Sequence, residues 1–124
     1  MLAAFDFGLT NTDVVISKSD ENQFHSFPTM EINDEFMLHI FDSINIKLGQ
    51  VSQIAVTGGK SSDLNDKFNN IPVKKVNEVD AIGSGAIALY DIETRPFVAV
   101  SAGTGTACVY FNGKNFNHLG GISV

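Results

Sequence analysis

Two stretches of the chain share one pattern, and this pattern constrains the fold more than any other feature. Residues 5–17 and 100–113 each read as an apolar strand, a turn of glycine and threonine, and a returning strand. The first belongs to a three-stranded meander expected at 2–28. Residues 97–124 are therefore expected to open a second copy of that meander, although two unrelated hairpins would give a similar pattern.

The alignment of the two stretches keeps a constant offset of 95 residues. It sets Asp6 against Ser101, and it lays residues 12–16 beside 107–111. Because Ser101 stands where the first copy has an acid, only the first hairpin offers a carboxylate next to its turn.

Hydrophobic periodicity predicts alternating strands and helices between these stretches. The segment 61–70 reads as a short helix or loop. The order βββαβαβα predicts an α/β ribonuclease-H-like domain, a mixed sheet with helices on its faces, followed by the opening β-hairpins of a second such domain. Strands are expected at 2–7, 12–17, 23–28, 53–57 and 71–76, and helices at 33–48, before Gly49, and at 78–93.

The domain division follows from this order. Residues 1–94 are expected to form the ribonuclease-H-like N-terminal domain, and residues 95–124 the truncated start of the second. Two strands and a turn cannot bury their own faces. We therefore expect the sequence to be part of a longer protein.

Composition excludes several classes of partner. Of the 124 residues, 44% are hydrophobic, and the net charge of −6 argues against nucleic acid or an anionic membrane as partner. The single cysteine, Cys108, allows no intrachain disulfide, which favours a cytoplasmic location. No apolar run approaches the ~20 residues of a membrane span, and no signal peptide is recognisable.

Both hairpin turns fit either of two interpretations. Asp6-x-Gly8-x-Thr10 and the run from Gly103 to Thr106 are typical of tight turns with glycine at positive φ. They are equally typical of phosphate cradles, because glycine lets the backbone approach an anion and hydroxyl groups can donate to it. An acid at a strand end can hold Mg²⁺, which makes Asp6 the candidate metal ligand.

Two further features lie between the hairpins. Thr57-Gly58-Gly59 closes an apolar strand, where ligands gather in open α/β sheets, or it is a flexible turn. Glu78 and Asp80 open a helix, where acids favour the helix dipole. A carboxylate held there is also a candidate general base.

With these residues in place, the chain resembles the type II, eukaryote-like pantothenate kinases of the acetate kinase, sugar kinase, Hsp70 and actin superfamily. The resemblance runs from Ala4 to Val124. It is carried by five parts in the family's order: Asp6-x-Gly8-x-Thr10, Thr57-Gly58-Gly59, Glu78-x-Asp80-Ala81, Gly103-Thr104-Gly105-Thr106 and Gly120-Gly121.

The resemblance implies transfer of the γ-phosphoryl group of MgATP to pantothenate, the first step of coenzyme A biosynthesis. It makes Glu78 the catalytic base, Asp6 the residue on the Mg²⁺ side, and the full-length protein a homodimer. The residues implied at ATP are Asp6, Gly8, Leu9, Thr10, Gly103, Thr104, Gly105 and Thr106, and those at the acceptor are Gly58, Gly59, Ala107, His118 and Gly121.

Three departures from the family keep alternatives open. Ala107 stands where the family has a serine at the pantothenate, and His118 stands where it has an arginine. Family members also continue into a full second domain, so the 124 residues alone are expected to be catalytically incomplete. The alternatives are a kinase of another small alcohol or sugar, and a non-catalytic nucleotide-binding or sensing module.

Overall fold

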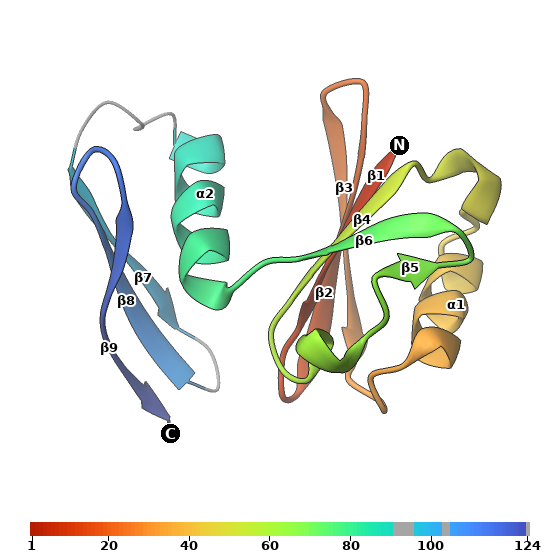
Figure 1. Ribbon diagram of the computed structural model, residues 1–124, viewed down its shortest axis with the longest axis horizontal. Coiled ribbons are helices and arrows are strands. Elements are labelled where there is room, and N and C mark those ends of the chain that lie inside the picture. The colour runs from red at the N-terminus through yellow and green to blue at the C-terminus, as the bar shows by residue number, and fades with distance from the viewer. Residues whose placement is uncertain (91–95, 103–104, 124) are drawn as a thin grey trace. The chain divides into compact units, whose positions relative to one another are not determined.

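The chain divides into two compact units, Met1–Val76 and Asn77–Val124 (Figure 1). The computed structural model describes residues 1–90, 96–102 and 105–123. The sequence-based division after residue 94 differs from this one, because it groups the helix that follows residue 77 with the first unit. In the structure that helix packs on the sheet of the second unit.

The first unit is built on a six-stranded mixed sheet with the order β3-β2-β1-β4-β6-β5. The first three strands form an antiparallel meander, β4 runs parallel to β1, and β6 runs parallel to β4. The short edge strand β5 is antiparallel to β6. The strands are β1 (Leu2–Phe7), β2 (Asn11–Lys18), β3 (Glu21–Pro28), β4 (Gln53–Thr57), β5 (Lys67–Phe68) and β6 (Ile71–Lys75).

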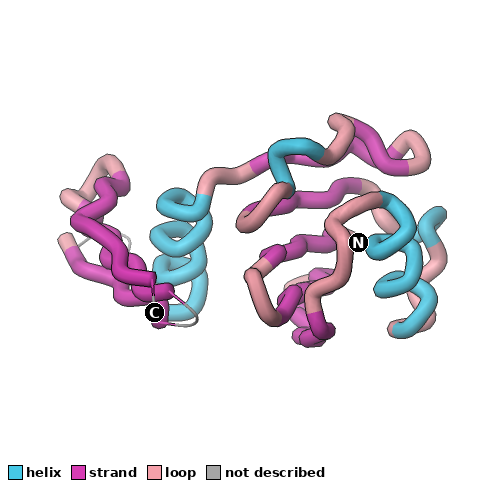
Figure 2. Tube along the Cα trace, turned by 90° about the horizontal axis from the view of Figure 1, so that it is seen from below, coloured by secondary structure: helices cyan, strands magenta, loops and turns pink. Residues whose placement is uncertain are grey.

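Helix α1 (Asp34–Ser43) covers one face of this sheet (Figure 2). Asn33 caps it, since its side-chain oxygen accepts a hydrogen bond from the Phe36 backbone N–H at 2.9 Å. The core below it is aromatic: Phe5 and Phe7 stack at 5.6 Å between ring centroids. The alternation of buried and exposed residues along β1 aims both rings at the helix.

Two details differ from the sequence-based expectation. The helix expected over 33–48 ends at Ser43 rather than before Gly49, because Asn45 adopts a positive φ of 59° that ends the helical path. In the segment 61–70, the structure has a single 3₁₀ turn, Ser61–Asp63, followed by β5.

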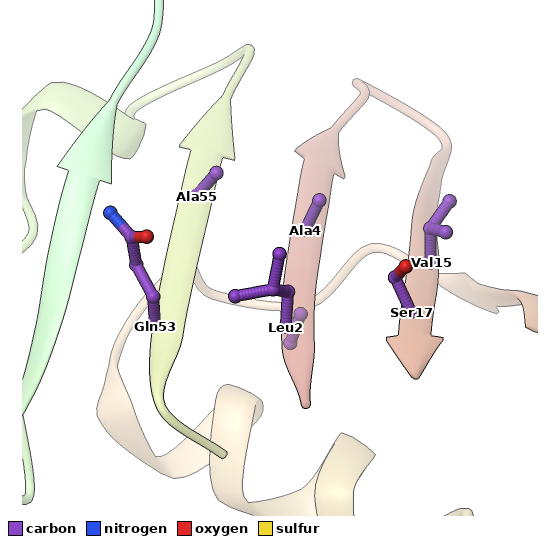
Figure 3. Close-up of a pocket in the computed structure, with 7 residues that line it drawn as sticks. Leu2, Ala4, Val15, Ser17, Gln53 and Ala55 are labelled. Atoms are coloured by element: carbon purple, nitrogen blue, oxygen red, sulfur yellow. The ribbon is translucent and has the colours of Figure 1, made fainter. Parts of the chain in front are cut away.

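The sheet face opposite α1 carries no helix from residues 1–76, all of which the structure describes. A shallow depression lies on it, with small and apolar side chains from β1, β2 and β4 (Figure 3). Its labelled lining residues are Leu2, Ala4, Val15, Ser17, Gln53 and Ala55.

The second unit packs helix α2 (Glu78–Tyr90) on an antiparallel sheet of order β7-β8-β9. Gly83 faces the ring of Phe116 so closely that any Cβ there would overlap the ring. This close approach accounts for the glycine at position 83, whereas a Cβ on Gly85 would meet nothing within 4 Å. The strands are β7 (Phe97–Ala102), β8 (Gly105–Phe111) and β9 (Phe116–Ser123).

The α/β ribonuclease-H-like fold predicted from the sequence is confirmed, and the second meander is present. The constant offset of 95 is wrong beyond the turn, however. Phe7 pairs with Thr12 in the first hairpin, whereas Ala102 pairs with Thr106 in the second. The second connection is one residue shorter, so Thr12 corresponds to Thr106 rather than to Ala107.

Candidate functional site

The carboxyl ends of β1 and β4 bring two of the sequence motifs together. The strands are parallel neighbours, and Asp6 lies directly beside Thr57. A Cβ built on Gly58 would lie 2.7 Å from an Asp6 carboxylate oxygen, and Gly58 has a φ of +79°. Both facts require glycine at this position. Asp6-x-Gly8-x-Thr10 and Thr57-Gly58-Gly59 therefore occupy one end of the first sheet (Figure 1).

The glycines of these motifs are held close to neighbouring backbone. A Cβ on Gly8 would lie 2.5 Å from the carbonyl oxygen of Asn11, and one on Gly59 would lie 2.9 Å from that of Phe7. The Gly8 N–H donates to the Asp6 carbonyl oxygen at 3.1 Å. The two turns are consequently tight, and of the two glycines after β4 Gly59 is exposed whereas Gly58 is buried. Tight glycine turns at strand ends are typical of phosphate cradles.

Leu9 and Thr10 form the exposed part of the first turn. Leu9 is 83% exposed although it is apolar. The Thr10 carbonyl oxygen accepts the backbone N–H of Thr29 at 2.9 Å, which ties the turn to the end of β3.

A row of oxygen-bearing side chains crosses this end of the sheet, and sequence reasoning missed part of it. Asp13 of β2 lies directly opposite Asp6, which in turn lies beside Thr57, so the three side chains share the face opposite α1. The Thr57 hydroxyl oxygen is buried and has no hydrogen-bond partner among the described residues. Alternation along β2 indicates that Asp13 lies on the exposed face of the sheet. Its pairing with Asp6, however, depends on the register of the hairpin, which the sequence does not give.

The residues present fit a magnesium ion that is shared with a ligand. Carboxylate and hydroxyl oxygens are the donors that Mg²⁺ prefers, and it usually takes one or two carboxylates together with phosphate oxygens and water. Within the described ranges, no group of three or more His, Cys, Asp and Glu side chains could hold a metal by itself. Asp6, with Asp13 opposite it, matches a site in which one or two carboxylates and the phosphate oxygens of a ligand hold the ion together.

The predicted base, Glu78, begins α2 in the second unit and is exposed. The helix start itself is organised by Asn77, which sequence reasoning missed as a cap. Its side-chain oxygen accepts from the Asp80 N–H at 2.9 Å, and its amide donates to the Asp80 carboxylate at 2.8 Å. Asp80 therefore has a capping role, while the role of Glu78 stays a prediction.

The predicted second phosphate loop is described in part. Gly103 and Thr104 lie outside the described residues. Gly105 begins β8 opposite Ser123 of β9. The half-buried Thr106 pairs with Ala102 of β7 on one side and with Ile122 of β9 on the other.

The predicted acceptor residues of the second unit fall on the β8–β9 pair. Ala107 lies directly opposite Gly121, so these two are brought together. His118 is exposed and lies opposite Val109, beyond an irregularity between Cys108 and Val109. The irregularity separates His118 from the other two along the ladder, and all three binding roles stay predictions.

Comparison of the sequence with protein-family models gave no match, and comparison with curated proteins gave no significant match. No helix in the described part of the chain is long and apolar enough to cross a membrane.

Solved structures gave many matches. The activator of the 2-hydroxyisocaproyl-CoA dehydratase from Clostridium difficile, with bound ADPNP, is 16% identical with a TM-score of 0.68, over 94% of this chain and 44% of that one. A candidate N-acetylglucosamine kinase from Porphyromonas gingivalis is 18% identical with a TM-score of 0.62, over 95% and 47%.

A third match is a ROK family protein from Streptococcus pneumoniae in complex with sucrose. It is 17% identical with a TM-score of 0.57, over 94% of this chain and 47% of that one. The chain thus spans less than half the length of these three proteins. At such low identity the likeness concerns the fold. The chain has the ribonuclease-H-like fold of these larger proteins, and the candidate site lies at the carboxyl ends of β1 and β4 in its first unit.

Proposed function

We propose that this chain is the N-terminal part of an ATP-dependent kinase, and that pantothenate is its acceptor. One observation carries the ATP-binding half of the proposal. The parallel pairing of β1 and β4 sets Asp6, the Gly8 turn and Gly58-Gly59 at one sheet end, with glycine required sterically at each turn. Tight glycine turns beside a carboxylate suit a magnesium–phosphate complex. The ADPNP bound to the similarly folded dehydratase activator supports a nucleotide as ligand.

The chemistry of the proposed reaction needs few protein groups. Phosphoryl transfer depends mostly on positioning and on neutralising charge, which Mg²⁺ supplies when it is bound. In the proposal, Gly8, Leu9 and Thr10 bind the phosphates, and the resemblance assigns Gly103 to Thr106 to the same phosphates. The Glu78 carboxylate accepts the proton of the primary hydroxyl, whose oxygen forms the new bond to the γ-phosphorus while the bond to ADP breaks.

The acceptor is tested by coupled ADP release from the longest product of the reading frame, with and without pantothenate. Pantothenate-dependent release is expected. Glu78→Gln is expected to lower kcat by about 10²–10⁴-fold while the affinity for ATP is kept. Near-normal turnover by Glu78→Gln would show that Glu78 is not the base.

A second candidate is a kinase of another small alcohol or sugar. Ala107 and His118 favour it, because the resemblance to pantothenate kinases fails at these two positions, and histidine at position 118 does not offer the guanidinium that suits a carboxylate. The sucrose in the ROK family protein adds support. ADP release with a panel of sugars and polyols, but not with pantothenate, is the result that would select this candidate.

A further inference from the structure

We propose that Thr29 is a positioning residue for the first phosphate-binding turn, with Thr12 as its hydrogen-bond donor. This inference rests on the proposed nucleotide-binding function and deepens it. Thr29 follows β3 and lies outside every sequence motif considered above. It nevertheless makes three hydrogen bonds at the turn: to the carbonyl oxygens of Gly8 and Thr10, and to the hydroxyl of Thr12.

The direction of each bond follows from counting hydrogens. The Thr29 hydroxyl donates to the Gly8 carbonyl oxygen at 2.7 Å. A hydroxyl carries one hydrogen, so the 2.9 Å contact between the Thr12 and Thr29 hydroxyls must be a donation by Thr12. The result is a chain from Thr12 through Thr29 to Gly8, in which each bond polarises the next.

The turn is held at two points from the same residue. The Thr29 hydroxyl binds the carbonyl of Gly8, and the Thr29 backbone N–H binds the carbonyl of Thr10 at 2.9 Å. Both carbonyl oxygens are therefore directed towards Thr29. Carbonyl oxygens repel phosphate, so removing them from the outer side of the turn favours an anion there.

The same geometry directs a donor outwards. In a trans peptide the C=O and the following N–H point in opposite directions, and the described chain has no cis peptide bonds. Since the Gly8 carbonyl points at Thr29, the Leu9 N–H points away from it. Leu9 is strongly exposed, so this N–H is presented on the open side of the turn.

Thr12 is suited to anchor this series of hydrogen bonds in the protein interior. It is fully buried, at 0% exposure, whereas Leu9 at the other side of the turn is 83% exposed. A buried hydroxyl needs a partner, and Thr29 provides it. A turn tethered from a buried side chain is ordered before ligand arrives, which lowers the entropic cost of binding.

The experiment compares four variants of the full chain with the wild type: Thr29→Val, which removes only the hydroxyl, Thr29→Ser, which keeps it, Thr12→Val, and Ser52→Ala. Ser52 is the matched control, because its hydroxyl makes a similar bond to a backbone carbonyl at the other end of β4. Affinity for Mg-ADPNP is measured by calorimetry. Motion of the Leu9 amide is measured by ¹⁵N relaxation without nucleotide.

Thr29→Val is expected to weaken Mg-ADPNP binding about tenfold and to increase the motion of the Leu9 amide. Thr29→Ser is expected to stay within about twofold of the wild type, Thr12→Val to fall between them, and Ser52→Ala to leave both readouts unchanged. A purely structural role for Thr29 would lower the melting temperature and leave the affinity of the folded protein unchanged.

The outcomes separate the two claims. Wild-type affinity and an unchanged Leu9 amide in Thr29→Val would overturn the role of Thr29 and leave the proposed function standing. A wild-type protein that binds no Mg-ADPNP would overturn the proposed function and with it the phosphate role of the turn. If Thr29→Val does not fold, Thr12→Val decides the claim: wild-type affinity and an unchanged Leu9 amide in this variant would overturn the role of the hydrogen bonds that run from Thr12 through Thr29 to Gly8.

Discussion

The two hairpins of this chain share a strand plan and differ in chemistry. Both are antiparallel meanders, and both place a glycine-containing turn after their first strand. Asp6 lies opposite Asp13 in the first, whereas Ser101 lies opposite Ala107 in the second. The first hairpin is therefore acidic beside its turn and the second is neutral.

The strands that follow the two turns are paired alike. Asn11 lies opposite Pro28 in the first hairpin, and Gly105 lies opposite Ser123 in the second. The comparison shows that a repeated strand plan can carry different chemistry: a pair of carboxylates beside the first turn, and a serine opposite an alanine beside the second.

The largest expected effect is at the carboxyl ends of β1 and β4, which are parallel neighbours. The described strands of the second sheet form antiparallel pairs only. Gly58→Ala is expected to lower the free energy of unfolding by about 2–4 kcal/mol, because φ is positive and the new Cβ meets Asp6 and Phe7. Denaturant titration measures it. Gly49→Ala is the control, because nothing lies within 4 Å of its Cβ position.

The acidic character of the first hairpin is tested next. Asp6→Asn is expected to weaken Mg-ADPNP binding by about 1.5–3 kcal/mol, the range for hydrogen bonds to charged groups. Ser101→Ala, its counterpart in the second hairpin, is expected to cost about 1 kcal/mol or less. Calorimetry with and without Mg²⁺ measures both. Equal losses in the two variants would contradict the special role of the carboxylate beside the first turn.

Thr12 and Thr106, which correspond in the two hairpins, are expected to differ in their effect on stability. Thr12 is fully buried and bonded to Thr29, whereas its counterpart Thr106 is only half-buried. Thr12→Val is expected to lower the free energy of unfolding by about 1 kcal/mol, and Thr106→Val by about half of that or less. Thermal unfolding of the two variants side by side distinguishes them. A larger effect at Thr106 would argue against the correspondence.

The smallest expected effect is a gain. Like charges directly opposite on neighbouring strands are destabilising, by roughly 0.2–1 kcal/mol, and Asp13 faces Asp6 in this way. Asp13→Asn is therefore expected to raise the free energy of unfolding in low salt and without Mg²⁺. The gain should shrink as salt is added, because the repulsion is screened. Loss of stability under these conditions is the result that would count against the carboxylate pair.

The sequence was sufficient for five of the six strands of the first sheet because their signals were local. The apolar residues of β1 and β2 and the Gly58-Gly59 turn each follow from a few neighbouring residues, whereas β5 lies in a segment that reads as a short helix or loop. The end of α1 was not predictable in the same way, because it depends on Asn45 adopting a positive φ where Gly49 was the more obvious stop.

The missing parts of the candidate site depend on pairing between distant strands. Asp13 becomes a candidate site residue only because the strand register sets it beside Asp6. Thr29 becomes one only because the end of β3 brings its hydroxyl to the Gly8 carbonyl oxygen. The sequence could not reveal that the second connection is one residue shorter. Aligning the strands with or without this one-residue shift matches apolar residues with apolar residues in both cases. Likewise, the small residues of α2 predicted a close approach without naming Phe116 as the partner.

The most direct test of the central claim is a titration of the isotopically labelled chain with ADPNP, followed through its backbone amides with and without Mg²⁺. Saturable shifts are expected at the amides of Gly8, Leu9, Thr10, Gly58 and Gly59, and these shifts should be larger with Mg²⁺ and smaller in Asp6→Asn. Absence of saturable shifts at these amides, or shifts confined to other parts of the chain, would contradict the claim.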